Sequence, residues 1–552
     1  MPTPSSSTTT TTVPSTGVTN IDALLTGVKW GSSLHSGITL TYSFPWSSGN
    51  STFFGRNNSS TYSTLDEPNA SLHYALTTEQ QQAARTAMQA WSNVANVQFT
   101  EVADNSSVVG DIRIGWTSAE DKASTGVKAW GWTYDPSSAP HGGDIWISTV
   151  SSGAKNPDWS VGSYNYEAIV HELGHALGLK HPFEDGVVLP TAIDNRQYSI
   201  MAYQDISNDL FRTITYDSAG KPDFHFFYVA PETPMVLDIA AMQLLYGANM
   251  NYKTGNDVYT FDTNKAFLKT IWDAGGNDTI SVANFSLGCK IDLTPGNYSD
   301  IRMISAPNPP GFTGGTVPDY LGIGNLGIAY GAYIENAIGG AGNDTLIGNE
   351  LNNTLTGNGG NDTIDGGLGQ DTVIFSSVRS NYTITASGSS ALVKAKTGTD
   401  GNDSLANVER LHFTDENVAL DINGTAGQAY RLYQAAFDRK PDMLGLGYWI
   451  ADMDKGSDLT TVAAGFMKSA EFQKLYGASP SNNTLVTNFY QNVLHRAPDQ
   501  DGFNYWLDQL NTHKITPAGA LASFCEGIEN QVLVIGAIQN GIDYLVWGGQ
   551  NA

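Results

Sequence analysis

The chain has 552 residues, of which 28 are lysine or arginine and 54 are aspartate or glutamate, so its formal net charge is −26. A chain of this length forms several domains with more than one core. The acidity argues against a nucleic-acid partner, because phosphate binding needs clustered cations, and it suits the binding of divalent cations by carboxylates. The two cysteines, Cys289 and Cys525, lie far apart, which predicts buried thiols and no disulfide framework.

Residues 1–17 are rich in threonine, serine and proline and are predicted to form a disordered tail. The segment lacks the basic and apolar stretches of a secretory signal peptide. No stretch approaches the ~20 apolar residues that cross a bilayer, so no membrane span is predicted.

A helix is predicted from Thr78, where Thr78 and Gln81 have the spacing of a capping box, and Ala84, Met88 and Trp91 belong to its buried stripe. Aromatic-rich alternating segments then predict four strands. These strands are Val97–Val102, Asp111–Trp116, Ala129–Tyr134 and Asp144–Ser148. The order of helix, strands and a second helix predicts an α/β domain.

The second helix carries the most informative motif of the chain. Residues 166–179 have the apolar period of a helix with one buried face. His171 and His175 are four residues apart, so their imidazoles project from the same side and can share one metal ion.

The residues around this histidine pair complete a zinc site. Gly178 permits a left-handed turn that ends the helix, which lets His181 return as a third ligand. Three neutral imidazoles leave the fourth zinc position to water, and Glu172 is placed to accept a proton from that water. The motif predicts one catalytic zinc ion.

The segment Tyr198–Tyr203 follows the third histidine and contains Met201. With it, the histidine motif resembles the metzincin pattern, in which a methionine turn follows His-Glu-x-x-His-x-x-Gly-x-x-His. Pro182 directly after His181, and Tyr203 two residues after Met201, resemble the serralysins. The resemblance implies that Met201 forms an apolar floor under the metal, and that Tyr203 is a zinc ligand that swings away to stabilise the oxyanion.

This resemblance implies a zinc metalloendopeptidase in which water, activated by the metal and by Glu172 as general base, attacks a peptide carbonyl. It also implies that residues 1 to about 17 are a propeptide removed on activation. Ala129, Trp130, Gly131 and Trp132 resemble the serralysin edge strand, to which an extended peptide substrate adds as a further strand. Leu237–Gly247 resembles the last packing helix of that domain.

Four nine-residue units begin at Gly339, Gly348, Gly357 and Gly366 and resemble the RTX repeat, a parallel β-roll held by calcium. The resemblance implies several structural calcium ions, bound by residues of the first, third and fourth units. These ligands are Gly340, Gly342, Asp344, Asn358, Gly360, Asp362 and Asp371. The second unit has Asn353 in place of the aspartate, which predicts a weaker calcium site or none.

An earlier acidic loop resembles the first calcium site of the serralysins. Asp273, Gly275 and Asp278 surround a bent glycine loop, and Lys253, Gly255 and Asp257 complete the predicted ligand set. Glu335, before the first repeat, is a further predicted ligand.

The C-terminal third contains a repeat with an offset of 57 residues, because Tyr433 to Trp449 recurs as Tyr490 to Trp506. It predicts two helical repeats that resemble a bacterial module of unknown function found at the ends of RTX and surface-layer proteins. Asp543–Val546 resembles the element that ends type I secretion substrates. That implies export through a type I secretion apparatus and calcium-dependent folding outside the cell.

The predicted fold class is an α/β metzincin protease domain, a parallel β-roll (RTX) domain and a small all-α C-terminal domain. The predicted bounds are 1–17 for the tail, 18–247 for the protease, 248–423 for the β-roll, 424–535 for the helical repeats and 536–552 for the secretion element. The predicted function is a secreted, extracellular, calcium-stabilised endopeptidase acting on proteins and peptides. The alternative is a calcium-folded adhesin or surface-layer-associated protein with a relic protease domain, held at the cell surface by the helical repeats.

Overall fold

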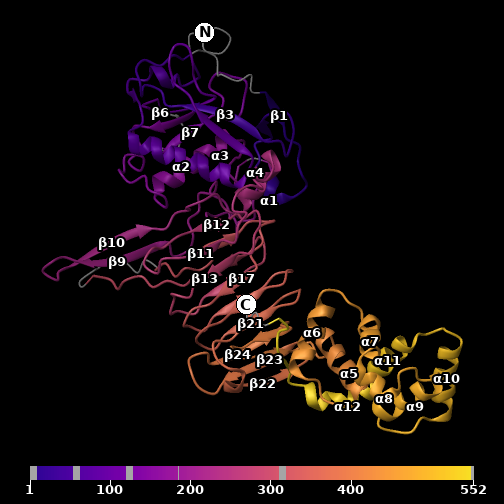
Figure 1. The fold of residues 1–552 in the computed structure, drawn as a ribbon. Helices are drawn as coiled ribbons and strands as arrows, with labels where there is room; N and C mark the ends of the chain where they lie inside the picture. The colour runs from indigo at the N-terminus through magenta and orange to yellow at the C-terminus, as the bar shows by residue number, and fades with distance from the viewer. Residues whose placement is uncertain (1–8, 54–61, 120–128, 185, 310–318, 549–552) are drawn as a thin grey trace. The chain divides into compact units, whose positions relative to one another are not determined.

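The computed structural model describes residues 9–53, 62–119, 129–184, 186–309 and 319–548 (Figure 1). The chain forms two compact units. Unit 1 comprises residues 1–280 and 289–334, and unit 2 comprises residues 281–288 and 335–552. These units divide the chain at positions other than the predicted domain boundaries, which stay predictions.

Unit 1 is built on a mixed sheet whose strand order is β5-β3-β6-β8-β7. The four predicted strands are present as β5 (Val97–Glu101), β6 (Ile112–Thr117), β7 (Gly131–Thr133) and β8 (Ile145–Ser148). The sequence analysis missed β3 (Ile38–Ser43), and β4 (His73–Tyr74) pairs with β6 off the main path. Strand β7 is antiparallel to β8 and forms one edge of the sheet.

Three helices accompany this sheet: α2 (Thr78–Val94), α3 (Tyr164–Ala176) and α4 (Val236–Tyr246). The capping box of α2 lies one residue earlier than predicted, because the Thr77 side chain accepts from the Gln80 backbone N–H. Helices α2 and α3 pack together, and the Trp91 indole donates to the Val170 carbonyl at 3.0 Å.

The prediction of a disordered tail through residue 17 is wrong for the part that the structure describes. Strand β1 (Thr10–Thr12) pairs antiparallel with β2 (Val28–Trp30), and Val13 is buried. The Asp22 carboxylate, at the end of α1 (Thr19–Asp22), accepts hydrogen bonds from the turn that precedes the helix. Residues 1–8 of the predicted tail lie outside the described residues.

Unit 1 continues as short β-structure. The hairpin of β9 (Leu210–Tyr216) and β10 (Pro222–Tyr228) is a separate two-stranded sheet (Figure 1). Strands β12 (Lys269–Ile271), β16 (Leu326–Ile328) and β15 (Tyr298–Ser299) form another sheet. The remaining short elements are η2 (Glu67–Asn69), β11 (Val258–Thr260), β13 (Thr279–Ser281) and β14 (Lys290–Asp292).

Unit 2 begins with the predicted parallel β-roll. One of its layers contains β17 (Asn336–Ile338), β19 (Thr354–Thr356), β21 (Thr372–Ile374) and β25 (Arg410–His412) in parallel register. The other contains β18 (Thr345–Ile347), β20 (Thr363–Asp365) and β24 (Asn402–Ala406). One apolar side chain of each repeat strand is buried between the layers: Leu346, Leu355, Ile364 and Val373. An antiparallel excursion of η3 (Arg379–Asn381), β22 (Tyr382–Ser387) and β23 (Ser390–Ala395) separates β21 from β24.

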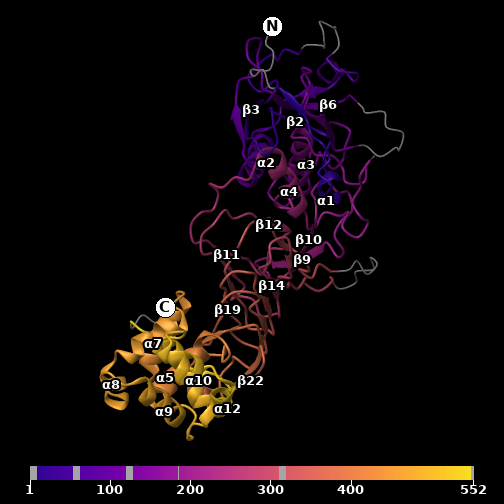
Figure 2. The ribbon, with the colours of Figure 1, turned by 90° about the vertical axis from the view of Figure 1, so that its right-hand side faces the viewer.

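A helical module follows, and its helices gather into one body (Figure 2). The first repeat comprises α5 (Thr425–Phe437), α6 (Met443–Asp454), α7 (Leu459–Met467) and α8 (Ala470–Tyr476). The second comprises α9 (Asn482–Asn492), α10 (Gln500–Asn511), α11 (Pro517–Cys525) and α12 (Ile528–Ile538). The repeated Pro-Asp-x-x-Gly motif caps helices, because Asp442 accepts from the Gly445 N–H and Asp499 from the Gly502 N–H.

The segment predicted as a secretion element returns to the β-structure. Strand β27 (Ile542–Tyr544) pairs with β26 (Asn417–Ala419), and the buried Ile542 and Tyr544 belong to the core of the helical module. In the part of the chain that the structure describes, no single helix is long and apolar enough to cross a membrane, and one bent pair, α11 with α12, reaches that length and composition only jointly. The three-part fold class predicted from the sequence is confirmed.

Candidate functional site

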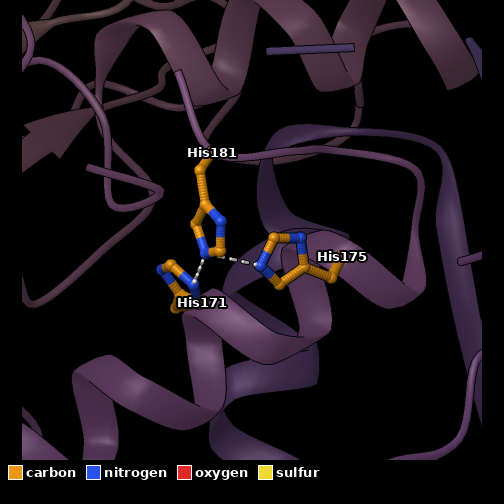
Figure 3. Close-up of side chains that lie close together, drawn as sticks. All are labelled: His171, His175 and His181. Carbon is orange, nitrogen blue, oxygen red and sulfur yellow. Dashed lines mark hydrogen bonds between the residues drawn. The ribbon is translucent and has the colours of Figure 1, made fainter. Parts of the chain in front are cut away.

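The three histidines of the motif converge on one point (Figure 3). The Nε2 atom of His181 lies 3.1 Å from the Nε2 of His171 and 3.1 Å from the Nε2 of His175. The first two histidines project from α3, as the spacing of four residues predicts. His181 reaches them from the segment after the helix.

The protonation state of these rings suits a cation. The Nδ1 atoms of His171 and His175 each lie 2.8 Å from a backbone carbonyl, of Ile200 and Leu179 respectively, and a carbonyl can only accept. The proton of each neutral ring therefore sits on Nδ1, and the lone pair of Nε2 points to the centre. Burial lowers the pKa of His171 well below its usual value and that of His175 to about 4, so both rings are neutral at physiological pH. Lone pairs that face one another at 3.1 Å repel, and a cation bound between them removes that repulsion, so the donor set fits zinc.

The turn that delivers His181 is fixed by the N-terminal segment. Gly178 has a φ of +108°, and a Cβ at this position would lie 2.4 Å from the Val28 carbonyl oxygen. The carbonyls that end α3 are all satisfied, since Ala176 O accepts from the Trp30 indole, Leu177 O from the Tyr246 hydroxyl and Gly178 O from Thr26. Residues 24–30 and α4 thereby hold the third ligand in place.

Met201 lies beneath the helix, as the resemblance implies. It is fully buried, and its Sδ would lie 2.6 Å from a Cβ at Gly174, which explains why glycine precedes His175. The buried Asp238 carboxylate holds the turn around Met201, because it accepts from the Ser199 hydroxyl and the Ile200 N–H. The Ile200 carbonyl is the acceptor for His171, so α4 orients the first histidine through this turn.

Glu172 is buried beside the three histidines. The Thr133 hydroxyl on β7 donates to its Oε2 at 2.6 Å. Burial raises the pKa of Glu172 to about 7, and the Thr133 hydrogen bond opposes that shift. A carboxylate with a pKa near neutrality can both accept and return a proton.

Tyr203 lies against two of the histidines. Its ring centroid is 4.6 Å from that of His181 and 5.9 Å from that of His171, and its side chain is half exposed. Burial raises the pKa of Tyr203 to about 12, so the phenol remains a hydrogen-bond donor at neutral pH. The predicted tyrosine therefore belongs to the same site.

Of the predicted substrate residues, Gly131 and Trp132 lie on the edge strand β7, and Ala129 and Trp130 directly precede it. Ala129 is exposed, and Trp130 is buried with its indole donating to Asn165 Oδ1 at 2.7 Å. Gly131 packs closely on β8, since a Cβ there would lie 2.7 Å from the Trp146 carbonyl oxygen. The Trp132 indole donates to Glu67 Oε1 at 3.0 Å.

The predicted first calcium site is partly assembled. Asp257, Asp273 and Asp278 offer carboxylate oxygens within 4.8 Å of one another. A Cβ on Gly276 would lie 2.0 Å from the Gly255 carbonyl oxygen, so that carbonyl lies at the same loop, whereas the Lys253 ammonium pairs with Asp257 at 2.7 Å. Gly275 donates its N–H to Asp273 at 3.0 Å.

In the β-roll, the sixth residue of each repeat lies on one of two rims. The first rim carries the turns 339–344 and 357–362, and the second carries the turns 348–353 and 366–371. Along the first rim, Asp362 accepts from the Asp344 N–H at 2.8 Å, and Gly340 donates to Asp344 at 2.6 Å. The Gly360 and Gly342 backbones touch, and the Asn358 amide donates to the Gly339 carbonyl.

Two of these aspartates suit a bound cation. Asp362 and Asp371 are buried, and the Oδ2 atom of each has no hydrogen-bond partner among the described residues. Burial raises the pKa of each to about 7. A buried carboxylate oxygen without a partner is costly unless an ion binds it, so the donors fit calcium.

In the second repeat, which is predicted to bind calcium weakly or not at all, the Asn353 amide makes hydrogen bonds within the protein. The Asn353 amide donates to the Glu335 carbonyl at 3.2 Å and to Asn349 Oδ1 at 3.1 Å. Its Oδ1 accepts from the Asn349 N–H at 2.7 Å. Both polar atoms of the Asn353 amide thus have partners within the protein, whereas Oδ2 of Asp362 and Oδ2 of Asp371 have none among the described residues. Glu335 contributes its backbone carbonyl to this turn.

The sequence analysis missed a fifth turn, residues 398–406. Asp403 accepts from the Asp362 N–H at 2.9 Å, as Asp362 does from Asp344, and Gly401 packs on the Gly360 carbonyl. The turn adds Asp403 to the first rim, and Glu409 follows on the second rim by accepting from the Asp371 N–H. The signal was the spacing Gly398-x-x-Gly401-x-Asp403-x-Leu405, which the excursion β22–β23 separates from the other repeats.

Other residues at the zinc site were also missed. Glu184 lies 2.6 Å from Nδ1 of His181, Thr133 contacts Glu172, and Asp238 holds the methionine turn. Of these, only Glu184 had a signal in the sequence, a carboxylate three residues after the last histidine.

Comparison with protein families gives four matches. Residues 54–209 match the family Matrixin, and residues 236–308 match the C-terminal region of the serralysin-type M10 peptidases. Residues 338–373 match the RTX calcium-binding nonapeptide repeat. Residues 426–475 and 463–534 match a domain of unknown function, DUF4214.

Several curated proteins are similar to this chain. Serralysin B of Dickeya chrysanthemi is 35% identical over 288 residues, which cover 48% of this chain and 53% of the relative. Serralysin C of the same organism is 36% identical over 283 residues, covering 48% and 52%. Serralysin of Proteus mirabilis is 33% identical over 343 residues, covering 56% and 58%. The chain thus spans about half the length of the curated relatives it matches.

Together these matches confirm the predicted resemblance, a serralysin-type metzincin with RTX repeats and an added C-terminal helical module. They also agree with the predicted cofactors, one zinc ion and several calcium ions.

Proposed function

We propose that this chain, whose domains resemble those of the serralysin-type metzincins, is a zinc-dependent endopeptidase stabilised by calcium. The observation that carries the proposal is the convergence of three imidazole Nε2 lone pairs beside a buried carboxylate. Neutral rings whose Nδ1 protons are held by carbonyls are pre-oriented ligands.

The roles of the residues follow from their positions. His171, His175 and His181 would hold zinc, which supplies Lewis acidity and lowers the pKa of a bound water. Glu172 accepts a proton from the attacking water and later donates it to the leaving amine. The Tyr203 phenol donates a hydrogen bond to the developing oxyanion.

The proposed substrates are proteins and peptides in extended conformation. Strand β7 is an edge of the sheet, so the backbone of a peptide can add to it as a further strand. The Gly131 backbone and its neighbours would recognise main-chain groups, which predicts little selectivity for side chains.

Secretion through a type I apparatus and an extracellular location are further parts of the proposal. They are supported by the RTX repeats and by the serralysin relatives. Removal of a propeptide near residue 17 is a further part of the proposal, and such a cut would sever the chain between the paired strands β1 and β2.

The alternative function is a calcium-folded adhesin or surface-layer-associated protein that retains a relic protease domain. The helical module is the observation that favours it, since this module is additional to the protease and RTX segments. The module would then bind a cell-surface component.

Zymography on casein, with zinc and calcium supplied, separates the two functions. The wild-type chain should clear casein, and Glu172→Ala should reduce clearing by about a hundredfold or more, since general bases contribute 10²–10⁴. The exposed Glu79→Ala on α2 serves as the matched control and should behave as wild type. Equal clearing by wild type and Glu172→Ala would refute the assigned chemistry, and no clearing by wild type would favour the adhesin.

A further inference from the structure

The side chain that holds the Glu172 carboxylate comes from the substrate strand and not from the zinc helix. The Thr133 hydroxyl donates to Glu172 Oε2 at 2.6 Å, and Thr133 is the last residue of β7. The catalytic helix and the edge strand are therefore joined at the proposed base.

A second side-chain bond ties α3 to Trp130, the residue that directly precedes β7. The Trp130 indole donates to Asn165 Oδ1 on α3 at 2.7 Å. Together with the bond between Thr133 and Glu172, this contact holds the edge strand and the residue before it against α3.

The two neighbours of Thr133 in the chain and the adjacent strand also fix its position. Its neighbours Trp132 and Tyr134 both donate to Glu67 Oε1, at 3.0 Å and 2.5 Å. Glu67 is fully buried, and Thr133 pairs with Ile145 of β8. The backbone of Thr133 is therefore held by the sheet independently of Glu172.

We propose that Thr133 is a positioning residue for the general base. Its hydroxyl fixes one oxygen of Glu172, and the other oxygen stays available to accept the proton. A glutamate side chain has several rotatable bonds, and a buried donor at 2.6 Å selects one arrangement of them. The inference rests on the proposed function, because it assigns Glu172 as the base. It adds that the strand which binds the substrate also sets the geometry of the chemistry.

The test uses the full chain loaded with zinc and calcium and a short fluorogenic peptide. Thr133→Val keeps the shape and removes the donor, and we expect kcat to fall by about tenfold to a hundredfold with KM within about twofold of wild type. Thr133→Ser keeps the donor and should restore most of kcat. Thr100→Val, an exposed threonine on the opposite edge strand β5, is the control and should leave both constants unchanged.

Several outcomes would overturn the inference. They are an unchanged kcat in Thr133→Val, a change confined to KM, or a Thr133→Ser variant as slow as Thr133→Val. Zinc content and melting temperature are measured for each variant, and Thr133→Ala provides a second donor-free chain. If both donor-free chains fail to fold, the role is structural and the inference falls. A wild-type chain without peptidase activity would instead refute the proposed function.

Discussion

Single residues prepare the zinc site largely through main-chain acceptors. The local spacing of His171, Glu172 and His175 could be predicted, because a helix fixes where residues four apart project. The Ile200 carbonyl and Asp238, which orient His171, could not be predicted, because they reach the site only after the chain has folded. Thr133 was missed for the same reason.

A buried carboxyl group on the sheet predicts a pH dependence. Asp144 accepts from the Arg113 N–H at 2.8 Å and from the Tyr62 hydroxyl, and burial raises its pKa from 3.8 to about 8. The folded state keeps this carboxyl protonated over a pH range in which the unfolded state ionises it. The contribution of Asp144 to the stability of the fold is therefore complete below pH 3.8 and is lost as the pH rises through about 8.

Asp144→Asn should remove this dependence, because an amide does not ionise, its oxygen can accept from the Arg113 N–H and its NH2 group can donate to the Tyr62 oxygen. In urea unfolding from pH 5 to pH 8, the free energy of unfolding of wild type relative to this variant should fall by as much as about 1.4 kcal/mol per pH unit. Metals are kept equal, so their own pH dependence cancels. A difference that does not change with pH would contradict the prediction.

Among the elements, the turns of the β-roll show what distinguishes a calcium site from an ordinary turn. The second repeat places the Asn353 amide where the third and fourth place carboxylates. The amide has hydrogen-bond partners within the protein, whereas one oxygen of each carboxylate has none among the described residues. The sequence predicted this difference from one residue. It did not reveal the fifth turn, because a hairpin interrupts the nine-residue period.

Asp362→Asn should convert a calcium-binding turn into one like the second. We expect the chain to bind about one calcium ion fewer and still fold at saturating calcium, since oxygen ligands set the charge of the site. Elemental analysis after gel filtration measures the count, and circular dichroism follows the calcium titration. Asp501→Asn, an exposed change on α10, is the control. An unchanged calcium count in Asp362→Asn would count against this site.

For the whole molecule, the sequence predicted the kinds of domain but not how they are joined. Residues that share a core can lie far apart in the chain: Ala419, Ile542 and Tyr544 belong to the core of the helical module. Arg410 on β25 also forms ion pairs with Asp421 and Asp454 of that module. No periodicity in the sequence reports such contacts.

This shared core predicts that calcium stabilises the helical module indirectly. Chelation should loosen the roll, remove the support that β26 and β27 give to the helices, and leave α3 in unit 1 protected for longer. Hydrogen exchange by mass spectrometry should show α5 and α12 losing protection together with β20 and β24. Calcium should restore it and magnesium should not, since magnesium demands stricter geometry. Helices that keep full protection after the roll has opened would contradict this coupling.

The two rims of the roll are unequal. Stacked carboxylates repel one another along the first rim once cations leave, whereas the second rim begins with a turn that is closed by its own amide. Withdrawal of the ions should therefore separate the two layers first along the first rim, while the turn that contains Asn353 keeps them joined along the second rim. A roll opened in this way would keep the register of its strands on the second rim, so it could close again when the ions return.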